Sequence, residues 1–162
     1  IPTRGFTNPH KQHFAPLNLD RLQFWIDQGR IDASKPITAR ELYESRCVHR
    51  VRDGVKLLAD GKEHLRTPVN LVVSRASHAA IAAVEQAGGS IVCRYYNATS
   101  LRALVMPHKW LAKNEPLPHF ADPVSQSDLL WYSSPNNRGY LALRDRVAAT
   151  TPSSPTSSNS SS

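Results

Sequence analysis

VNLVVSRASHAAIAAVEQAGGSIVCRY, residues 69–95, is the stretch of sequence that decides the fold. The apolar runs 69–73 and 91–95 at its two ends each predict a strand. The alanine-rich residues between them predict a helix over 77–87 that two glycines end. The cap of this helix is one of two serines, Ser74 or Ser77. A strand, a helix and a strand in this order indicate a parallel crossover, so we expect a mixed α/β core.

Shorter elements are predicted on the N-terminal side of this unit. Residues 18–29 have the apolar spacing of an amphipathic helix, with an asparagine as its cap and a glycine at its end. Residues 38–45 begin with a threonine and a glutamate at the spacing of a capping box, which predicts a second helix. Residues 55–58 predict a strand, and the Asp-Gly pair after it predicts a turn toward the strand at 69–73.

The composition divides the chain into a core with extensions. Residues 1–16 contain three prolines and no acidic residue, and predict an extended basic arm without regular structure. Residues 17–106 form the expected globular core, which ends in a further short helix over 97–105. Residues 107–149 are proline-rich and read as an extension rather than a domain. Residues 150–162 are almost wholly Ser, Thr, Pro and Asn, and predict a disordered tail.

The charge balance favours a polyanionic partner. Twenty Lys and Arg against 13 Asp and Glu leave a formal net charge of +7, with a sequence pI of about 9.8. This balance suits nucleic acid or an anionic membrane surface. The sequence contains no apolar run long enough to span a bilayer and no secretory signal, so we expect a soluble protein.

The cysteines and the methionine bear on compartment and processing. Ile1 is the first residue and Met106 the only methionine, so we expect a processed chain or a fragment of a longer product. Cys47 and Cys93 are too few for a disulfide framework and are expected to be buried free thiols in a reducing compartment. Cys47 and His49 could supply two zinc ligands, but no CxxC partner follows, so no metal or other cofactor is expected.

Cationic side chains gather in four places, where they could neutralise phosphates and, beside aromatic rings, stack on unpaired bases. They are the basic arm, the segment 46–56, the start of the helix over 77–87, and the stretch 86–114, which lacks Asp and Glu. The solvated face of any basic protein can look like this, so that interpretation stays open. The candidate RNA-binding residues are Arg4, Lys11, His13, Arg46, Arg50, Arg52, Lys56, Arg75, His78, Arg94 and Lys109.

The motifs of common enzymes are absent from the sequence. It has no phosphate-binding loop, no GxGxxG, no GxSxG and no HExxH. Gly88 and Gly89 follow a helix rather than open one, so they end it and do not cradle a phosphate. We therefore expect no catalysis and no small-molecule substrate.

Several blocks in a fixed order resemble a known family. They are RGF at 4–6, FAPLNLDRL at 14–22, DGVKLLADG at 53–61 and VNLVVSRASHAAIAAVEQAGGSI at 69–91. Together they resemble large-subunit ribosomal protein fifteen over residues 3–95. The resemblance implies the fold shared with ribosomal protein eighteen-e, in which irregular strand-strand-helix units surround a small core, with a hairpin at 53–61. It also implies binding and stabilisation of large-subunit rRNA, with no cofactor.

Two departures from the family pattern suggest a particular branch. The Gly- and Arg-rich arm that precedes RGF in the family is absent from this sequence, and residues 96–162 run beyond the end of bacterial members. Such an extension is similar to that of fungal mitochondrial members, which implies a place in the mitochondrial ribosome beside neighbouring ribosomal proteins. The competing hypothesis is a protein-interaction module that recruits a partner through its proline-rich residues 107–135. An enzyme is a more distant third.

Overall fold

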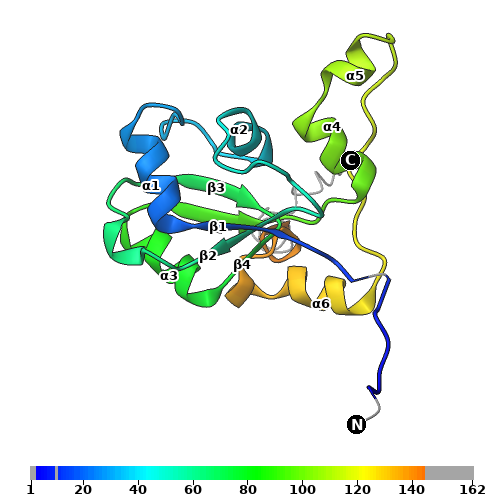
Figure 1. The fold of residues 1–162 in the computed structure, drawn as a ribbon, viewed down its shortest axis with the longest axis horizontal. Helices are drawn as coiled ribbons and strands as arrows, with labels where there is room; N and C mark the ends of the chain where they lie inside the picture. Colours follow the sequence, from blue (N-terminus) through cyan, green and yellow to red (C-terminus); the bar gives the residue numbers. More distant parts are fainter. Residues whose placement is uncertain (1–2, 10, 145–162) are drawn as a thin grey trace, which may run out of the picture.

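Two small parallel sheets form the centre of the molecule (Figure 1). The structure is a computed structural model, and it describes residues 3–9 and 11–144. The first sheet has the strand order β1-β2-β4 and the second pairs β3 with β5. The strands are β1 (Ala15–Asn18), β2 (Val55–Leu58), β3 (Asn70–Val73), β4 (Arg75–Ala76) and β5 (Ser90–Cys93). The chain passes directly from one sheet to the other at Ser74, which is 3% exposed.

Helices cover the strands on two sides. In the view of Figure 1, α1 and α2 lie above the strands, α3 and α6 lie below them, and α5 projects away from the rest. α4 packs beside α2 and contributes Leu101 and Val105 to the core. The helices are α1 (Leu19–Asp27), α2 (Ala39–Glu44), α3 (His78–Gln86), α4 (Ala98–Val105), α5 (His108–Leu111) and α6 (Gln126–Ser133), with short 3-10 helices η1 (Lys62–His64) and η2 (Pro135–Asn137). The capping box at Thr38 and Glu41 is present, and Ser77 is the cap of α3.

One hydrophobic core joins the two sheets to the helices. Alternate residues of the strands point into it, and α1 and α3 each contribute one apolar face. Its largest fully buried members include Leu17, Leu22, Leu42, Leu57, Leu71 and Val84. Burial of such side chains is the main term that holds a domain of this size together. The mixed α/β fold and the parallel crossover from β3 through α3 to β5 are therefore confirmed.

Two expectations about the strands were wrong. Segment 53–61 does not form a hairpin, because β2 pairs in parallel with β1 and β4. The expected arm also ends earlier than residue 16, because β1 begins at Ala15. Pro16 had indicated irregular structure, but β1 is an edge strand, where the missing N–H costs no hydrogen bond to a neighbour.

The extension is more ordered than its prolines suggested. It contains α5, α6 and η2, and Tyr132 of α6 is buried in the same core cluster as the strands. The hydroxyl of Tyr132 donates to the carbonyl of Ser74 at 2.7 Å. Gly139 then continues the second sheet beside Cys93. A Cβ at Gly139 would collide with the backbone of Tyr132, so this close approach requires glycine. The predicted tail at 150–162 lies outside the described residues.

Candidate nucleic-acid interface

Segment 46–56 presents its cationic side chains to solvent because apolar residues anchor it from below. Cys47 and Val48 are 2% and 6% exposed and belong to the core cluster. The residues beside them cannot also enter the core, so their charged side chains remain in water, where ionised groups are most stable. The exposed cations of the segment are Arg46, His49, Arg50, Arg52 and Lys56.

A groove of about 470 Å³ lies against this segment. Its walls come from the start of β1, from α1 and from the segment itself. Its basic lining residues are Arg21, His49, Arg50 and Arg52, and no Asp or Glu lines it. None of these three arginines has an ion-pair partner among the described carboxylates. The groove is therefore a site of uncompensated positive potential, which favours an anion.

Asp53, the one acidic residue of segment 46–56, does not line the groove. The carboxylate of Asp53 accepts the backbone N–H of His13 at 2.6 Å, and the N–H of Asp53 donates to the carbonyl of His13 at 3.0 Å. This pair of bonds ties the base of the arm to the turn before β2. It also keeps the Asp53 carboxylate occupied by a neutral partner of the chain.

The remaining exposed candidates are distributed over the surface. Arg4, Lys11 and His13 belong to the arm, His78 is the first residue of α3, and Lys109 lies on α5. All five side chains are exposed, as a role in phosphate contact requires. The geometry brings none of them into the lining of the groove.

Arg75 is engaged within the protein. Its Nη2 donates to Oδ1 of Asp128 on α6 at 3.0 Å, and the two side chains are only 26% and 15% exposed. Its guanidinium carbon also lies 5.3 Å from the ring centroid of Phe14 and 4.8 Å from that of Trp131. A planar guanidinium stacks well on aromatic faces while it pairs with a carboxylate. Its predicted role in RNA binding stays a prediction.

Arg94 has similar surroundings just after β5. Its guanidinium carbon lies 4.6 Å from the ring centroid of Phe120, 5.7 Å from that of Tyr140 and 5.9 Å from that of Tyr96. Phe120 and Tyr140 both belong to the extension. Like Arg75, Arg94 therefore helps to attach the extension to the core, and its contact with RNA also stays a prediction.

Sequence reasoning missed the cations of α1. Arg21 lines the groove, and Arg21 and Arg30 place their guanidinium carbons 4.7 Å and 5.2 Å from the ring centroid of Trp25. Arg21 and Trp25 are four residues apart on a predicted helix, which places them on one face. This spacing could have revealed the pair. The approach of Arg30 depends on the turn after α1 and could not be read from spacing.

The two cysteines are candidates for a reactive side chain. Both cysteines are free and buried, as expected. Burial raises the pKa of both thiols, that of Cys93 to about 12, so neither is a reactive thiolate near neutral pH. Among residues 3–9 and 11–144, no cluster of His, Cys, Asp and Glu could hold a metal ion. Within the same residues, no helix is both long and apolar enough to cross a bilayer.

Comparison with known proteins adds three relatives. A Neurospora crassa protein named large ribosomal subunit protein uL15m is 40% identical over 161 residues, which cover 86% of this chain and 51% of that protein. The uL15m protein of Danio rerio is 42% identical and covers 91% of this chain and 51% of its own length. The uL15 protein of the bacterium Paramagnetospirillum magneticum is 50% identical over 91 residues, 56% of each chain.

The coverage of these relatives bears on the extension. The two uL15m matches cover 86% and 91% of the chain, so each must include at least part of residues 107–144. The bacterial match covers 56% of the chain. The chain spans about half the length of the curated relatives it matches. None of these relatives has a name that supports the alternative of a protein-interaction module.

The family comparison agrees with the fold. A family model that describes ribosomal proteins 50S-L15 and 50S-L18e, together with a 60S counterpart, matches residues 16–92. These residues include both sheets and the helices α1 to α3. The resemblance noted in the sequence is thereby confirmed, and the chain belongs to the family of ribosomal proteins 50S-L15 and 50S-L18e.

Proposed function

We propose that this protein is a structural constituent of the mitochondrial large ribosomal subunit, where it binds and stabilises rRNA without catalysis. The groove carries this proposal. It is lined by Arg21, His49, Arg50 and Arg52, it has no acidic lining, and its arginines lack partners among the described carboxylates. Family membership and the names of the N. crassa and D. rerio relatives support the same assignment and the mitochondrial ribosome as its location.

The groove suits a phosphodiester backbone rather than a small molecule. Guanidinium groups bind phosphate oxygens through two parallel N–H donors, and each neutralised phosphate releases counterions. The floor of the groove is fixed by β1 and by the buried Cys47 and Val48, so the arginines extend from a rigid base. A fixed array of cations matches the fixed spacing of phosphates in folded RNA.

The other exposed cations extend this surface. In the assembled subunit they contact further rRNA phosphates, while the extension lies beside neighbouring ribosomal proteins. Arg75 and Arg94 have less exposed guanidinium groups and contribute less to this surface than the rest. The further phosphate-binding residues of the proposal are Arg4, Lys11, His13, Arg46, Lys56, His78 and Lys109.

Binding of an rRNA fragment at increasing salt tests the proposal. The double variant Arg50→Ala/Arg52→Ala removes two groove cations, so the slope of log affinity against log salt should fall by about two units. The matched control Arg138→Ala/Arg144→Ala removes two arginines that pair with Glu85 and Asp122. This control should keep nearly the whole slope. Binding that does not depend on salt, or equal slopes for the two double variants, would contradict the proposal.

A measurement in cells tests the location. The tagged full-length protein should sediment with large-subunit particles when mitochondria are fractionated on a density gradient. The groove variant should shift part of the protein to the light fractions, since it weakens the attachment to rRNA. A protein that sediments free of particles in the wild type would overturn the assignment.

A further inference from the structure

Phe24 is a large apolar side chain that the fold leaves in water. It lies on α1 and is 54% exposed, although Leu22 and Gln23 next to it are 0% and 2% exposed. Phenylalanine in the middle of a well-packed helix usually faces the core, and a single exposed ring is weak evidence of function. The surroundings of Phe24 provide the stronger evidence.

The ring of Phe24 is held in place by Trp25. The indole Nε1–H of Trp25 donates to the carbonyl of Ser45 at 2.8 Å, which fixes the indole against the end of α2. The two rings meet edge to face, with centroids 5.7 Å apart and planes at 61°. A ring restrained in this way loses little conformational entropy when a flat ligand stacks on it.

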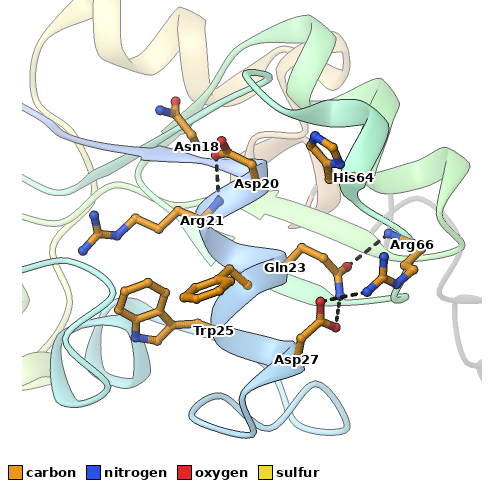
Figure 2. Close-up of a pocket in the computed structure, with 9 residues that line it drawn as sticks. Asn18, Asp20, Arg21, Gln23, Trp25, Asp27, His64 and Arg66 are labelled. Carbon is orange, nitrogen blue, oxygen red and sulfur yellow. Dashed lines mark hydrogen bonds and ion pairs between the residues drawn. The ribbon is translucent and has the colours of Figure 1, made fainter.

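Two arginines without carboxylate partners lie beside the indole of this aromatic pair. Arg21 and Arg30 approach Trp25 and form no ion pair with a described carboxylate. The nearby carboxylate of Asp27 is occupied, because it accepts from Arg66 at 2.8 Å and from Gln23 at 2.8 Å. Figure 2 shows Arg21 extended on the side of Trp25, and the Asp27–Arg66 pair on the other side of α1.

An open depression of about 610 Å³ surrounds these side chains. Its lining includes Arg21, Phe24, Trp25, His64 and Arg66, together with two carboxylates. Asp27 pairs with Arg66, and Asp20 accepts the backbone N–H of Arg21 at 2.7 Å. Arg21 also lines the groove beside segment 46–56, so the depression and the groove meet at one side chain. A nucleotide has the same two parts, a flat base and an anionic phosphate, joined by a sugar.

We propose that the face of α1 around Phe24 binds an unpaired RNA base by stacking, while Arg21 and the groove hold the adjoining phosphates. This inference rests on the proposed function, because it assigns a base-binding site to the same RNA surface. Stacking on an aromatic ring needs an accessible base face, so the site selects single-stranded segments, loops or bulges over duplex. Arg21 and Arg30, which lack an ion-pair partner among the described carboxylates, favour RNA over the apolar surface of a protein.

The test compares two RNA probes with the full chain. One probe is a twelve-nucleotide single strand of mixed sequence, and the other is a duplex of the same length (about twelve base pairs). Phe24→Ala should weaken binding of the single strand about tenfold and change binding of the duplex less than about twofold. Phe24→Tyr keeps a stacking ring and should bind like the wild type. Phe24→Leu keeps apolar area without the ring and should behave like Phe24→Ala.

The outcomes separate this inference from the function on which it rests. If Phe24→Ala binds both probes as the wild type does, or if Phe24→Leu keeps the affinity for the single strand, the stacking site is wrong. The same holds if Phe24→Ala lowers incorporation into particles while both RNA affinities stay unchanged, because a protein would then occupy the face. If the proposed function itself is wrong, the wild-type protein should bind neither probe in a salt-dependent way.

Discussion

The arginines near the extension and the arginines of the groove differ in what surrounds their guanidinium groups. Arg75 and Arg94 are partly buried, and they contact Asp128 or aromatic rings that residues 107–144 supply. Arg21 and Arg50 are exposed and have no partner among the described carboxylates. The same residue type therefore serves two purposes in one small protein.

This difference shows what a count of charges cannot reveal. A positive charge attracts RNA only if the fold leaves it uncompensated and reachable. The carboxylate of Asp128 lies 53 residues from Arg75 in the sequence, and only the docking of α6 brings the two together.

The largest expected effect concerns the docking of the extension. Tyr132 is 2% exposed, its ring contacts three other aromatic rings, and its hydroxyl donates to Ser74. Tyr132→Ala should lower the free energy of unfolding by about 3–5 kcal/mol, because it leaves a cavity and an unpaired carbonyl. Chemical denaturation of the full chain measures this.

The matched control for this variant lies on the same helix. Leu130 is 66% exposed, and Leu130→Ala should change the free energy of unfolding by less than about 0.5 kcal/mol. If the two variants were equally stable, α6 would not be docked in solution, and the contrast between the two sets of arginines would lose its basis.

The next effect in size separates the two possible roles of Arg75. Arg75→Ala leaves the partly buried carboxylate of Asp128 unpaired, so it should cost about 2 kcal/mol of unfolding free energy. The combined variant Arg75→Ala/Asp128→Asn should cost less than the sum of its two single changes, since the same contact is lost only once. If stability instead stays constant while the salt slope of RNA binding falls by about one unit, Arg75 is a phosphate ligand, as the sequence alone predicted.

Loss of the Arg21 side chain should weaken RNA binding and have little effect on stability, in contrast to loss of Arg75. Arg21→Ala removes an exposed cation that lines the groove, so the salt slope of RNA binding should fall by about one unit. The free energy of unfolding should change by less than about 1 kcal/mol, because the side chain is exposed and its contact with the ring of Trp25 is weak in water. Arg138→Ala is the control of equal charge, and it should keep the slope because Glu85 already offsets Arg138. Equal slopes for the two variants would remove Arg21 from the RNA surface.

The sequence contained most of the fold because its signals were local. The apolar runs, the serine cap and the paired glycines around α3 act within a few residues, and they predicted the crossover correctly. The pairing of β2 and the docking of α6 depend on contacts between distant segments, which no local pattern encodes. Family resemblance supplied the fold type but suggested a hairpin that the structure does not contain.

The candidate site was predictable only in part for a similar reason. Arg50 and Arg52 could be identified because they crowd into one short exposed segment. Arg21 was missed, since its place in the groove follows from the way α1 packs beside segment 46–56. Arg75 was named for its place before a helix, whereas its surroundings are set by α6. The local density of charges in the sequence therefore identifies clusters of cationic residues. Which of these residues can contact RNA depends on how the elements pack together.

The smallest expected effect concerns the pH dependence of the extension. Hydrogen bonds from Arg144 and Tyr140 hold the pKa of Asp122 below its ordinary value near 3.8. A carboxyl whose pKa is lower in the folded state stabilises the fold above its unfolded pKa, and this contribution is lost as the pH falls through its folded pKa. Asp122→Asn should therefore be slightly less stable than the wild type near pH 7, and this difference should shrink below about pH 4 in denaturation measured across pH.

Glu115→Gln, which removes an exposed carboxylate with no ion pair among the described residues, should follow the wild-type curve. A difference between Asp122→Asn and the wild type that stays constant down to low pH would mean that the contacts of Asp122 do not help to hold the extension on the core.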